Sequence, residues 1–262
     1  MMETDIRELE KVQNAVLKAK NIVKRFGHVQ ALGGVDFELK RGEVVALVGD
    51  NGAGKSTLIK CFSGVYQADE GEIEIDGVPV KINSPMESRY YGVETVFQDL
   101  SLAPDVSVAA NVFLGREIER HGILGKIGFL DYPEMQKRAD KFIREVGVNL
   151  PSVEIPAESL SGGQRQAVAI ARARAWASKV LLLDEPTASL GVRQTEIVLD
   201  IIKASKDRGM GIVVISHDLP SVLKIADRVV VLRLGKVAGN FQAESVTYAD
   251  VVSAMLGKEF KA

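Results

Sequence analysis

The stretch that decides the fold is Val44-Val45-Ala46-Leu47-Val48-Gly49-Asp50-Asn51-Gly52-Ala53-Gly54-Lys55-Ser56-Thr57. It predicts a buried strand, a glycine-rich loop and a helix that starts near Lys55. The loop matches the phosphate-binding pattern G-x-x-x-x-G-K-[ST] at every position. Glycines let backbone N–H groups turn around a phosphate, and a helix N-terminus adds roughly half a positive charge. Lys55 can reach the β- and γ-phosphates of a nucleotide, and Ser56 can offer its hydroxyl to Mg²⁺. The alternative is a tight strand–helix turn with an exposed lysine.

The composition is that of an ordinary globular protein. Of 262 residues, 46% are hydrophobic and 26% are charged, and the formal net charge is −2. This charge argues against a surface that coats nucleic acid, so we expect no nucleic-acid partner. The single cysteine, Cys61, excludes an internal disulfide and a zinc site built from several cysteines. No apolar run approaches 18 residues and no secretory signal is visible, so we expect a cytoplasmic protein that meets a membrane only through a partner.

The sequence on either side of the glycine-rich loop predicts an α/β fold. Residues 15–19 predict an edge strand, and residues 35–39 alternate apolar with acidic side chains, as a half-solvated antiparallel strand does. Residues 71–77 alternate again and end in Asp-Gly, a hairpin signal. Residues 99–159 combine helical periodicity with prolines and glycines, and we interpret them as a helical insertion rather than a separate folding domain. The last third returns to buried strands and amphipathic helices.

Three of the predicted buried strands end in side chains suited to nucleotide hydrolysis. One leads into the glycine-rich loop, one ends in Asp184 and Glu185, and one is followed by His217. Ligands of open α/β sheets bind beyond the carboxyl ends of the strands, so we expect these groups along one edge. Asp184 is then suited to Mg²⁺, Glu185 to orienting and deprotonating a water molecule, and His217 to contacting the γ-phosphate. The alternatives are a helix N-cap for the paired acids and an ordinary strand-end histidine.

A second glycine motif, Leu160-Ser161-Gly162-Gly163-Gln164, opens a helix that we expect to extend to about Ala177. A capping box would explain Ser161 and Gln164. It would not explain the two glycines, which cost up to roughly 2 kcal/mol relative to alanine in a helix. Their presence suggests that another group approaches the bare backbone closely. Exposed N–H groups and a serine hydroxyl predict a second anion site at this helix start.

With these motifs in this order, residues 15–240 resemble the ATP-binding cassette (ABC) family, whose signature is LSGGQ. The resemblance implies a P-loop NTPase core with a RecA-like mixed sheet, an N-terminal antiparallel β subdomain and an inserted α-helical subdomain. It implies one ATP-binding domain over 1–262. Within it, 15–98 form the β subdomain and P-loop core, 99–177 form the helical subdomain with the signature helix, and 178–262 form the remainder of the core.

The resemblance also implies the site residues and two cofactors, ATP and Mg²⁺. Catalysis is expected from Lys55, Gln98, Glu185 and His217, and metal binding from Ser56, Gln98 and Asp184. Phe26 falls where the family stacks an aromatic ring on adenine, although an ordinary strand-end phenylalanine fits the same pattern. The expected nucleotide-binding residues are Phe26, Gly49, Asp50, Asn51, Gly52, Ala53, Gly54, Lys55, Ser56, Thr57, Ser161, Gly162, Gly163 and Gln164.

Partners follow from the same resemblance. In the family, two subunits form a head-to-tail sandwich, so Ser161 and Gly163 of one copy are expected to close over ATP on the P-loop of the other. One departure follows Glu185: the family's loop there usually ends in aspartate, whereas this sequence has Gly191. The contact that such an aspartate makes across a dimer is therefore not carried over.

Two segments, residues 97–104 and 111–117, resemble the ATPases of bacterial monosaccharide importers. We therefore expect the ATPase subunit of a ribose/xylose/fructose-type importer. It would work as a homodimer on the cytoplasmic face, beneath integral-membrane permeases and indirectly with a sugar-binding protein. One alternative is a non-transport ABC ATPase acting on protein scaffolds, as in iron–sulfur assembly. Another is a nucleotide-binding regulator without catalysis, against which Lys55, Glu185 and His217 together argue.

Overall fold

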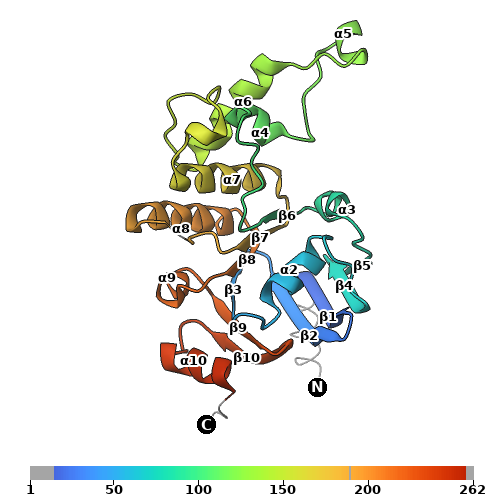
Figure 1. The fold of residues 1–262 in the computed structure, drawn as a ribbon, viewed down its shortest axis with the longest axis vertical. Helices are drawn as coiled ribbons and strands as arrows, with labels where there is room; N and C mark the ends of the chain where they lie inside the picture. Colours follow the sequence, from blue (N-terminus) through green and yellow to red (C-terminus); the bar gives the residue numbers. More distant parts are fainter. Residues whose placement is uncertain (1–14, 189, 258–262) are drawn as a thin grey trace, which may run out of the picture.

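The chain is built around a six-stranded sheet, as the computed structural model shows for residues 15–188 and 190–257 (Figure 1). The strand order is β10-β9-β3-β8-β7-β6, and neighbours run parallel except β10 and β9. The strands are β3 (Val44–Val48), β6 (Val93–Val96), β7 (Val180–Asp184), β8 (Gly211–Ile215), β9 (Arg228–Arg233) and β10 (Lys236–Gln242). Strands β3, β7 and β8 are buried along their whole length, which agrees with their unbroken apolar sequence.

A second sheet is antiparallel and has the order β2-β1-β4-β5. Its strands are β1 (Ala15–Phe26), β2 (Val29–Lys40), β4 (Glu70–Ile75) and β5 (Val78–Val80). The prediction of an edge strand at residues 15–19 was wrong, because β1 pairs with β2 on one side and β4 on the other. The predicted hairpin is confirmed: Asp76 and Gly77, with φ of +51° and +75°, form the turn between β4 and β5.

Helices and the second sheet cover the two faces of the core sheet. Helix α2 (Lys55–Phe62) and the antiparallel sheet share a hydrophobic cluster with one face, through residues such as Leu58 and Leu47. Helices α7 (Gly162–Trp176) and α8 (Val192–Lys206) pack on the other face. The remaining core helices are α3 (Pro85–Tyr90), α9 (Leu219–Leu223) and α10 (Tyr248–Leu256). The expected fold class, a mixed α/β core with an antiparallel sheet and added helices, is confirmed.

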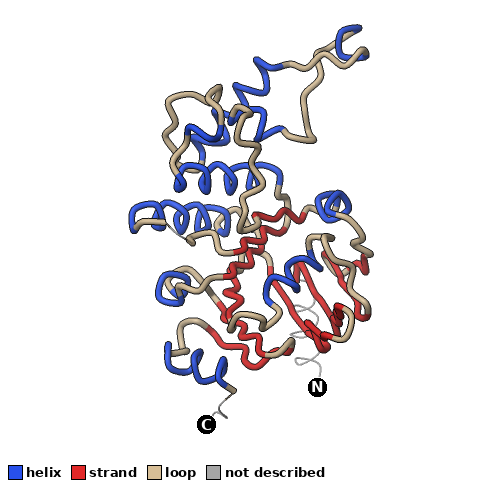
Figure 2. Tube along the Cα trace, viewed as in Figure 1, coloured by secondary structure: helices blue, strands red, loops and turns tan. Residues whose placement is uncertain are grey.

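A group of helices lies at one end of the molecule (Figure 2). They are α4 (Val108–Phe113), α5 (Ile123–Lys126), α6 (Tyr132–Glu145) and the 3₁₀ helix η1 (Ala157–Ser159). One hydrophobic cluster runs from Val44 in the core sheet through Ile170 in α7 to Phe113 and Met135. This continuity supports our proposal that residues 99–159 are an insertion within one domain and not a separate folding unit. No helix in the described residues has the length and apolar character needed to cross a bilayer.

Candidate active site

The strand order places four functional segments side by side. Strand β3 leads into the P-loop, and β7 ends at Asp184, which Glu185 follows directly. His217 comes two residues after the end of β8, and Gln98 comes two residues after the end of β6. Because β3, β8, β7 and β6 are consecutive parallel neighbours, their carboxyl ends lie along one edge of the sheet. The structure therefore brings the P-loop, Asp184-Glu185 and His217 to one edge, as the strand pattern predicted, and adds Gln98, which only the family resemblance indicated.

Close packing explains why two positions of the P-loop are glycine. A methyl group on Gly49 would lie 2.2 Å from the carbonyl oxygen of Leu232. Gly54, with φ of +106°, is the N-cap of α2, and a methyl group there would lie 2.8 Å from the carbonyl oxygen of Ala31. Residues 50–52 form the exposed crest of the loop, whereas 53–55 are buried and 56–57 are half-buried at the helix start. The crest thus offers backbone N–H groups to a ligand from outside.

The side chain of Lys55 bends back onto the backbone of the P-loop. Its Nζ donates hydrogen bonds to the carbonyl oxygens of Gly49 and Asp50, at 2.7 and 3.0 Å. Burial lowers the pKa of Lys55, and the carboxylates of Glu185, Asp184 and Asp50 oppose that shift. A buried ammonium held by two neutral carbonyls is suited to exchange them for phosphate oxygens, which carry the opposite charge and so accept stronger hydrogen bonds.

Ser56 and Asp184 form the best place for a cation. Ser56 Oγ donates to Asp184 Oδ1 at 3.4 Å, and Asp184 is only 4% exposed. Burial raises the pKa of Asp184, the Ser56 hydrogen bond lowers it, and the neighbouring Glu185 raises it further. Among the described residues, no group of three or more His, Cys, Asp and Glu side chains could hold a metal alone. Two protein oxygens nevertheless suit Mg²⁺, which keeps several waters and takes phosphate oxygens as ligands.

Glu185 and His217 are in direct contact. His217 Nε2 lies 2.7 Å from Glu185 Oε1, and the imidazole is half exposed. Glu185 has a φ of +54°, in the left-handed region, and its N–H donates to the carbonyl oxygen of Ile215 at 3.0 Å. A non-glycine residue in this region carries strain of the kind found at functional sites. The pair can hold or pass a proton between carboxylate and imidazole.

Gln98 and Phe26 are less closely joined to these groups. Gln98 is exposed two residues after the end of β6, and in the described part of the chain no hydrogen bond joins it to Ser56 or Asp184. Phe26 is the last residue of β1 and is 42% exposed, with Tyr66 at 5.1 Å in an edge contact. Lys24 Nζ also lies over the ring, 5.6 Å from its centroid, so the Phe26 ring has two fixed neighbours and is still partly exposed. The sequence pattern did not reveal Tyr66, since the contact joins residues forty positions apart.

The second glycine motif has the predicted capping box. Ser161 Oγ accepts from the N–H of Gln164 at 3.3 Å, and Gln164 Oε1 accepts from the N–H of Ser161 at 3.0 Å. Gly162 faces open space, with nothing within 4 Å of an added methyl group. Gly163, in contrast, faces the side chain of Gln194 in α8, a contact that sequence reasoning missed. We call Ser161–Gln164 the signature tip.

The signature tip borders a pocket of about 380 Å³ together with residues 147–149, Arg193, Gln194 and Ile197. No P-loop residue is among the described residues that line this pocket. The P-loop and the signature tip of one chain therefore do not share this pocket.

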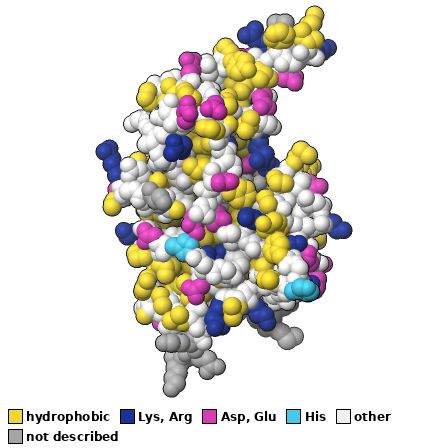
Figure 3. Space-filling view, viewed as in Figure 1, with side chains coloured by type: hydrophobic (Ala, Val, Ile, Leu, Met, Phe, Trp, Pro, Cys, Tyr) yellow, Lys and Arg dark blue, Asp and Glu magenta, His cyan; other side chains and the backbone are white. Residues whose placement is uncertain are grey.

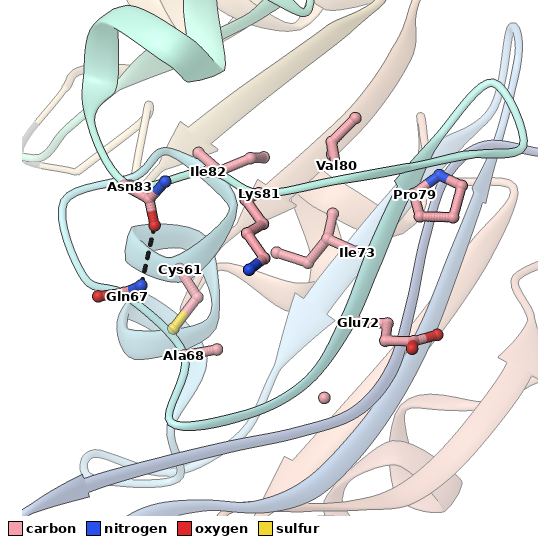
Figure 4. Close-up of a pocket in the computed structure, with 11 residues that line it drawn as sticks. Cys61, Gln67, Ala68, Glu72, Ile73, Pro79, Val80, Lys81, Ile82 and Asn83 are labelled. Atoms are coloured by element: carbon pink, nitrogen blue, oxygen red, sulfur yellow. Dashed lines mark hydrogen bonds between the residues drawn. The ribbon is translucent and has the colours of Figure 1, made fainter.

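Another pocket, of about 360 Å³, lies between the end of α2 and strands β4 and β5 (Figure 4). Gln67 Nε2 donates to Asn83 Oδ1 at its rim, at 2.8 Å. Cys61 lines it, and burial raises the pKa of that thiol to about 11. None of the expected nucleotide-binding residues is among the described residues lining this pocket.

On the face of the molecule that Figure 3 shows, acidic and basic side chains are interspersed.

Comparison with known proteins shows which family has this sequence and fold. Residues 32–188 match the family model described as ABC transporter. The fructose import ATP-binding protein FrcA of Rhizobium meliloti is 47% identical over 247 residues, which cover 94% of this chain and 95% of that protein. The xylose/arabinose import ATP-binding protein XylG of Sulfolobus acidocaldarius is 41% identical, over 92% of this chain and 93% of that protein. The galactofuranose transporter ATP-binding protein YtfR of Escherichia coli is 40% identical, and the match spans 47% of its length.

Comparison with solved structures also finds ATP-binding cassettes. The dimeric post-hydrolysis state of the ATP-binding cassette MJ0796, bound to ADP and Pi, has a TM-score of 0.73 and 28% identity. That match covers 88% of this chain and all of that one. A P-loop, two acids after a buried strand, a neighbouring histidine and a capped glycine motif thus occur on the fold of the cassette ATPases. This chain belongs to the ABC transporter family.

Proposed function

We propose that this chain is the ATP-hydrolysing subunit of an importer that takes up a monosaccharide. Two copies would work head to tail beneath integral-membrane permeases, on the cytoplasmic face of the cell membrane, with a sugar-binding protein delivering the solute. The names of the FrcA and XylG relatives support a sugar as the solute, since both match this chain over nearly their full length.

One observation carries the head-to-tail pairing. The P-loop edge holds the groups that bind and cleave a triphosphate, whereas the signature tip is a second anion site on a different pocket of the same chain. The Ser161 oxygen accepts a hydrogen bond within its cap, so its own O–H remains free to donate to a phosphate oxygen. A second copy would bring its signature tip to the first copy's P-loop, and each site would then be complete only in the pair.

Within one site, we assign each side chain a separate task. The Phe26 ring would stack on adenine, and Lys55 would leave its loop carbonyls for the β- and γ-phosphates. Ser56, Asp184 and Gln98 would hold Mg²⁺, which offsets the negative charge of the phosphates. Glu185 would accept a proton from the attacking water, and His217 beside it would donate a hydrogen bond to the γ-phosphate oxygens.

Purification from native membranes tests the assignment to transport. A tagged copy of the chain is expected to co-purify with a membrane protein of several transmembrane helices, in mild detergent and without crosslinking. Recovery with scaffold proteins alone would support the non-transport alternative and contradict the proposal.

Dilution tests the shared site. Specific ATPase activity should fall as the enzyme is diluted below the dissociation constant of the pair, because each site needs both copies. Constant specific activity over that range would contradict a site shared between two copies.

A further inference from the structure

The side chain of Gln194, in the first turn of α8, lies between Gly163 of the signature tip and Gly191 at the start of α8. A methyl group on Gly163 would lie 2.5 Å from Gln194 Cγ and 3.1 Å from its Cβ. A methyl group on Gly191 would lie 2.7 Å from Gln194 Oε1. The distances of 2.5 and 2.7 Å are shorter than real Cβ contacts, so in its observed position this side chain occupies volume that larger residues at 163 and 191 would need.

These two glycines belong to segments that are separate in sequence. Gly163 lies in the signature tip, whereas Gly191 ends the segment that follows Glu185 and is the N-cap of α8. No side chain caps α8 at this position, although Ser, Thr, Asp and Asn are the usual caps. The amide of Gln194 instead reaches back to the place where a side chain of residue 191 would stand. One side chain therefore spans the gap between the two segments.

The contact of Gln194 with the two glycines depends on van der Waals packing. In the part of the chain that the structure describes, no hydrogen bond holds the Gln194 amide, and the residue is exposed beside the pocket that the signature tip borders. Its Cβ, which the helix backbone places, and its Cγ lie against Gly163, whereas its amide end lies against Gly191. Truncation of Gln194 at Cβ would remove the atoms that lie between the signature tip and Gly191.

We propose that Gln194 is a positioning residue, which sets the spacing between the signature tip and the start of α8 at Gly191 and so aims the signature tip at the ATP of a second copy. The inference rests on the proposed head-to-tail pair.

The experiment compares Gln194→Ala and Gln194→Met, with Glu196→Ala as the matched control on the exposed surface of the same helix. Four quantities are measured: kcat, the affinity of the isolated subunit for a fluorescent ATP analogue, Tm, and ATP-driven dimerisation in a Glu185→Gln background. Gln194→Ala should lower kcat and weaken dimerisation by about 10-fold, because misplacement of a contacting group costs rate steeply. Analogue affinity and Tm should stay unchanged, since the P-loop of the same chain is not involved.

Gln194→Met keeps the length of the side chain and should restore both kcat and dimerisation, and Glu196→Ala should behave like the unmodified chain. The inference is overturned if Gln194→Ala turns over ATP at the normal rate while the Glu185→Gln parent dimerises. It is also overturned if Gln194→Met is as slow as Gln194→Ala. Failure of the parent itself to dimerise with ATP would instead contradict the shared site, and the inference with it.

Discussion

The buried ion pair between Glu43 and Arg228 joins the start of the P-loop strand to neighbouring strands. We predict that breaking this pair lowers the free energy of unfolding substantially. Arg228 Nε donates to Glu43 Oε1 at 2.8 Å, and its second terminal nitrogen donates to Glu43 Oε2 at 3.3 Å. The same guanidinium donates to Asn240 Oδ1 at 3.1 Å and to the carbonyl oxygen of Glu38 in β2. Both charged residues are 9% exposed. The arginine thus joins both sheets beside the start of β3.

Arg228→Ala should lower the free energy of unfolding by about 3–5 kcal/mol, because it leaves the Glu43 carboxylate buried without its partner. At about 2–4 °C per kcal/mol for a chain of this size, Tm should fall by roughly 6–20 °C. Urea unfolding followed by circular dichroism measures the first quantity and calorimetry the second.

Two further variants make this test specific. Arg144→Ala removes an exposed i,i+4 pair with Asp140 and should leave stability unchanged within error. Glu43→Leu combined with Arg228→Met removes both charges and should recover much of the loss. The reasoning is refuted if Arg228→Ala is no more damaging than Arg144→Ala.

Three other predictions concern single side chains of the site and its surroundings. Lys55→Ala should weaken binding of a fluorescent ATP analogue by about 10- to 100-fold, as expected for lost charge-assisted bonds, and unchanged affinity would contradict the phosphate role. Burial raises the pKa of Asp184, so folding favours its protonated form. The stability that protonation contributes is present at low pH and is lost as pH rises through the raised pKa. The Tm gain of Asp184→Asn without nucleotide should therefore grow from about pH 4 upward and then level off; a gain independent of pH would count against burial as the cause. Cys61, with its pKa raised to about 11, should react with iodoacetamide at pH 8 only after unfolding, and rapid labelling of the native protein would contradict its burial.

The sequence predicted the parts of this structure that depend on local patterns. Unbroken apolar runs gave the buried strands β3, β7 and β8, and Asp76-Gly77 gave a hairpin, because burial and turn geometry constrain neighbouring residues directly. The grouping of the P-loop with Glu185 and His217 followed from the parallel direction of those strands.

Features that depend on contacts between distant segments could not be predicted in this way. Residues 15–19 were assigned to an edge because their own sequence does not record that β4 would pair on the second side. The contact of Gln194 with Gly163 has no signal in either segment, since each glycine alone is compatible with an open surface. The contact of Lys55 with the carbonyl oxygen of Gly49 likewise depends on the path of the loop, which the motif pattern alone does not record.

The central claim is that ATP bound on one copy's P-loop is enclosed by the signature tip of another copy. Size-exclusion chromatography with light scattering on Glu185→Gln tests it most directly, because this variant should bind ATP and leave it uncleaved. The account predicts a dimer with saturating ATP and Mg²⁺, and a monomer when Lys55→Ala is added to the same variant. A Glu185→Gln protein that binds ATP and stays monomeric at every concentration tested would contradict it.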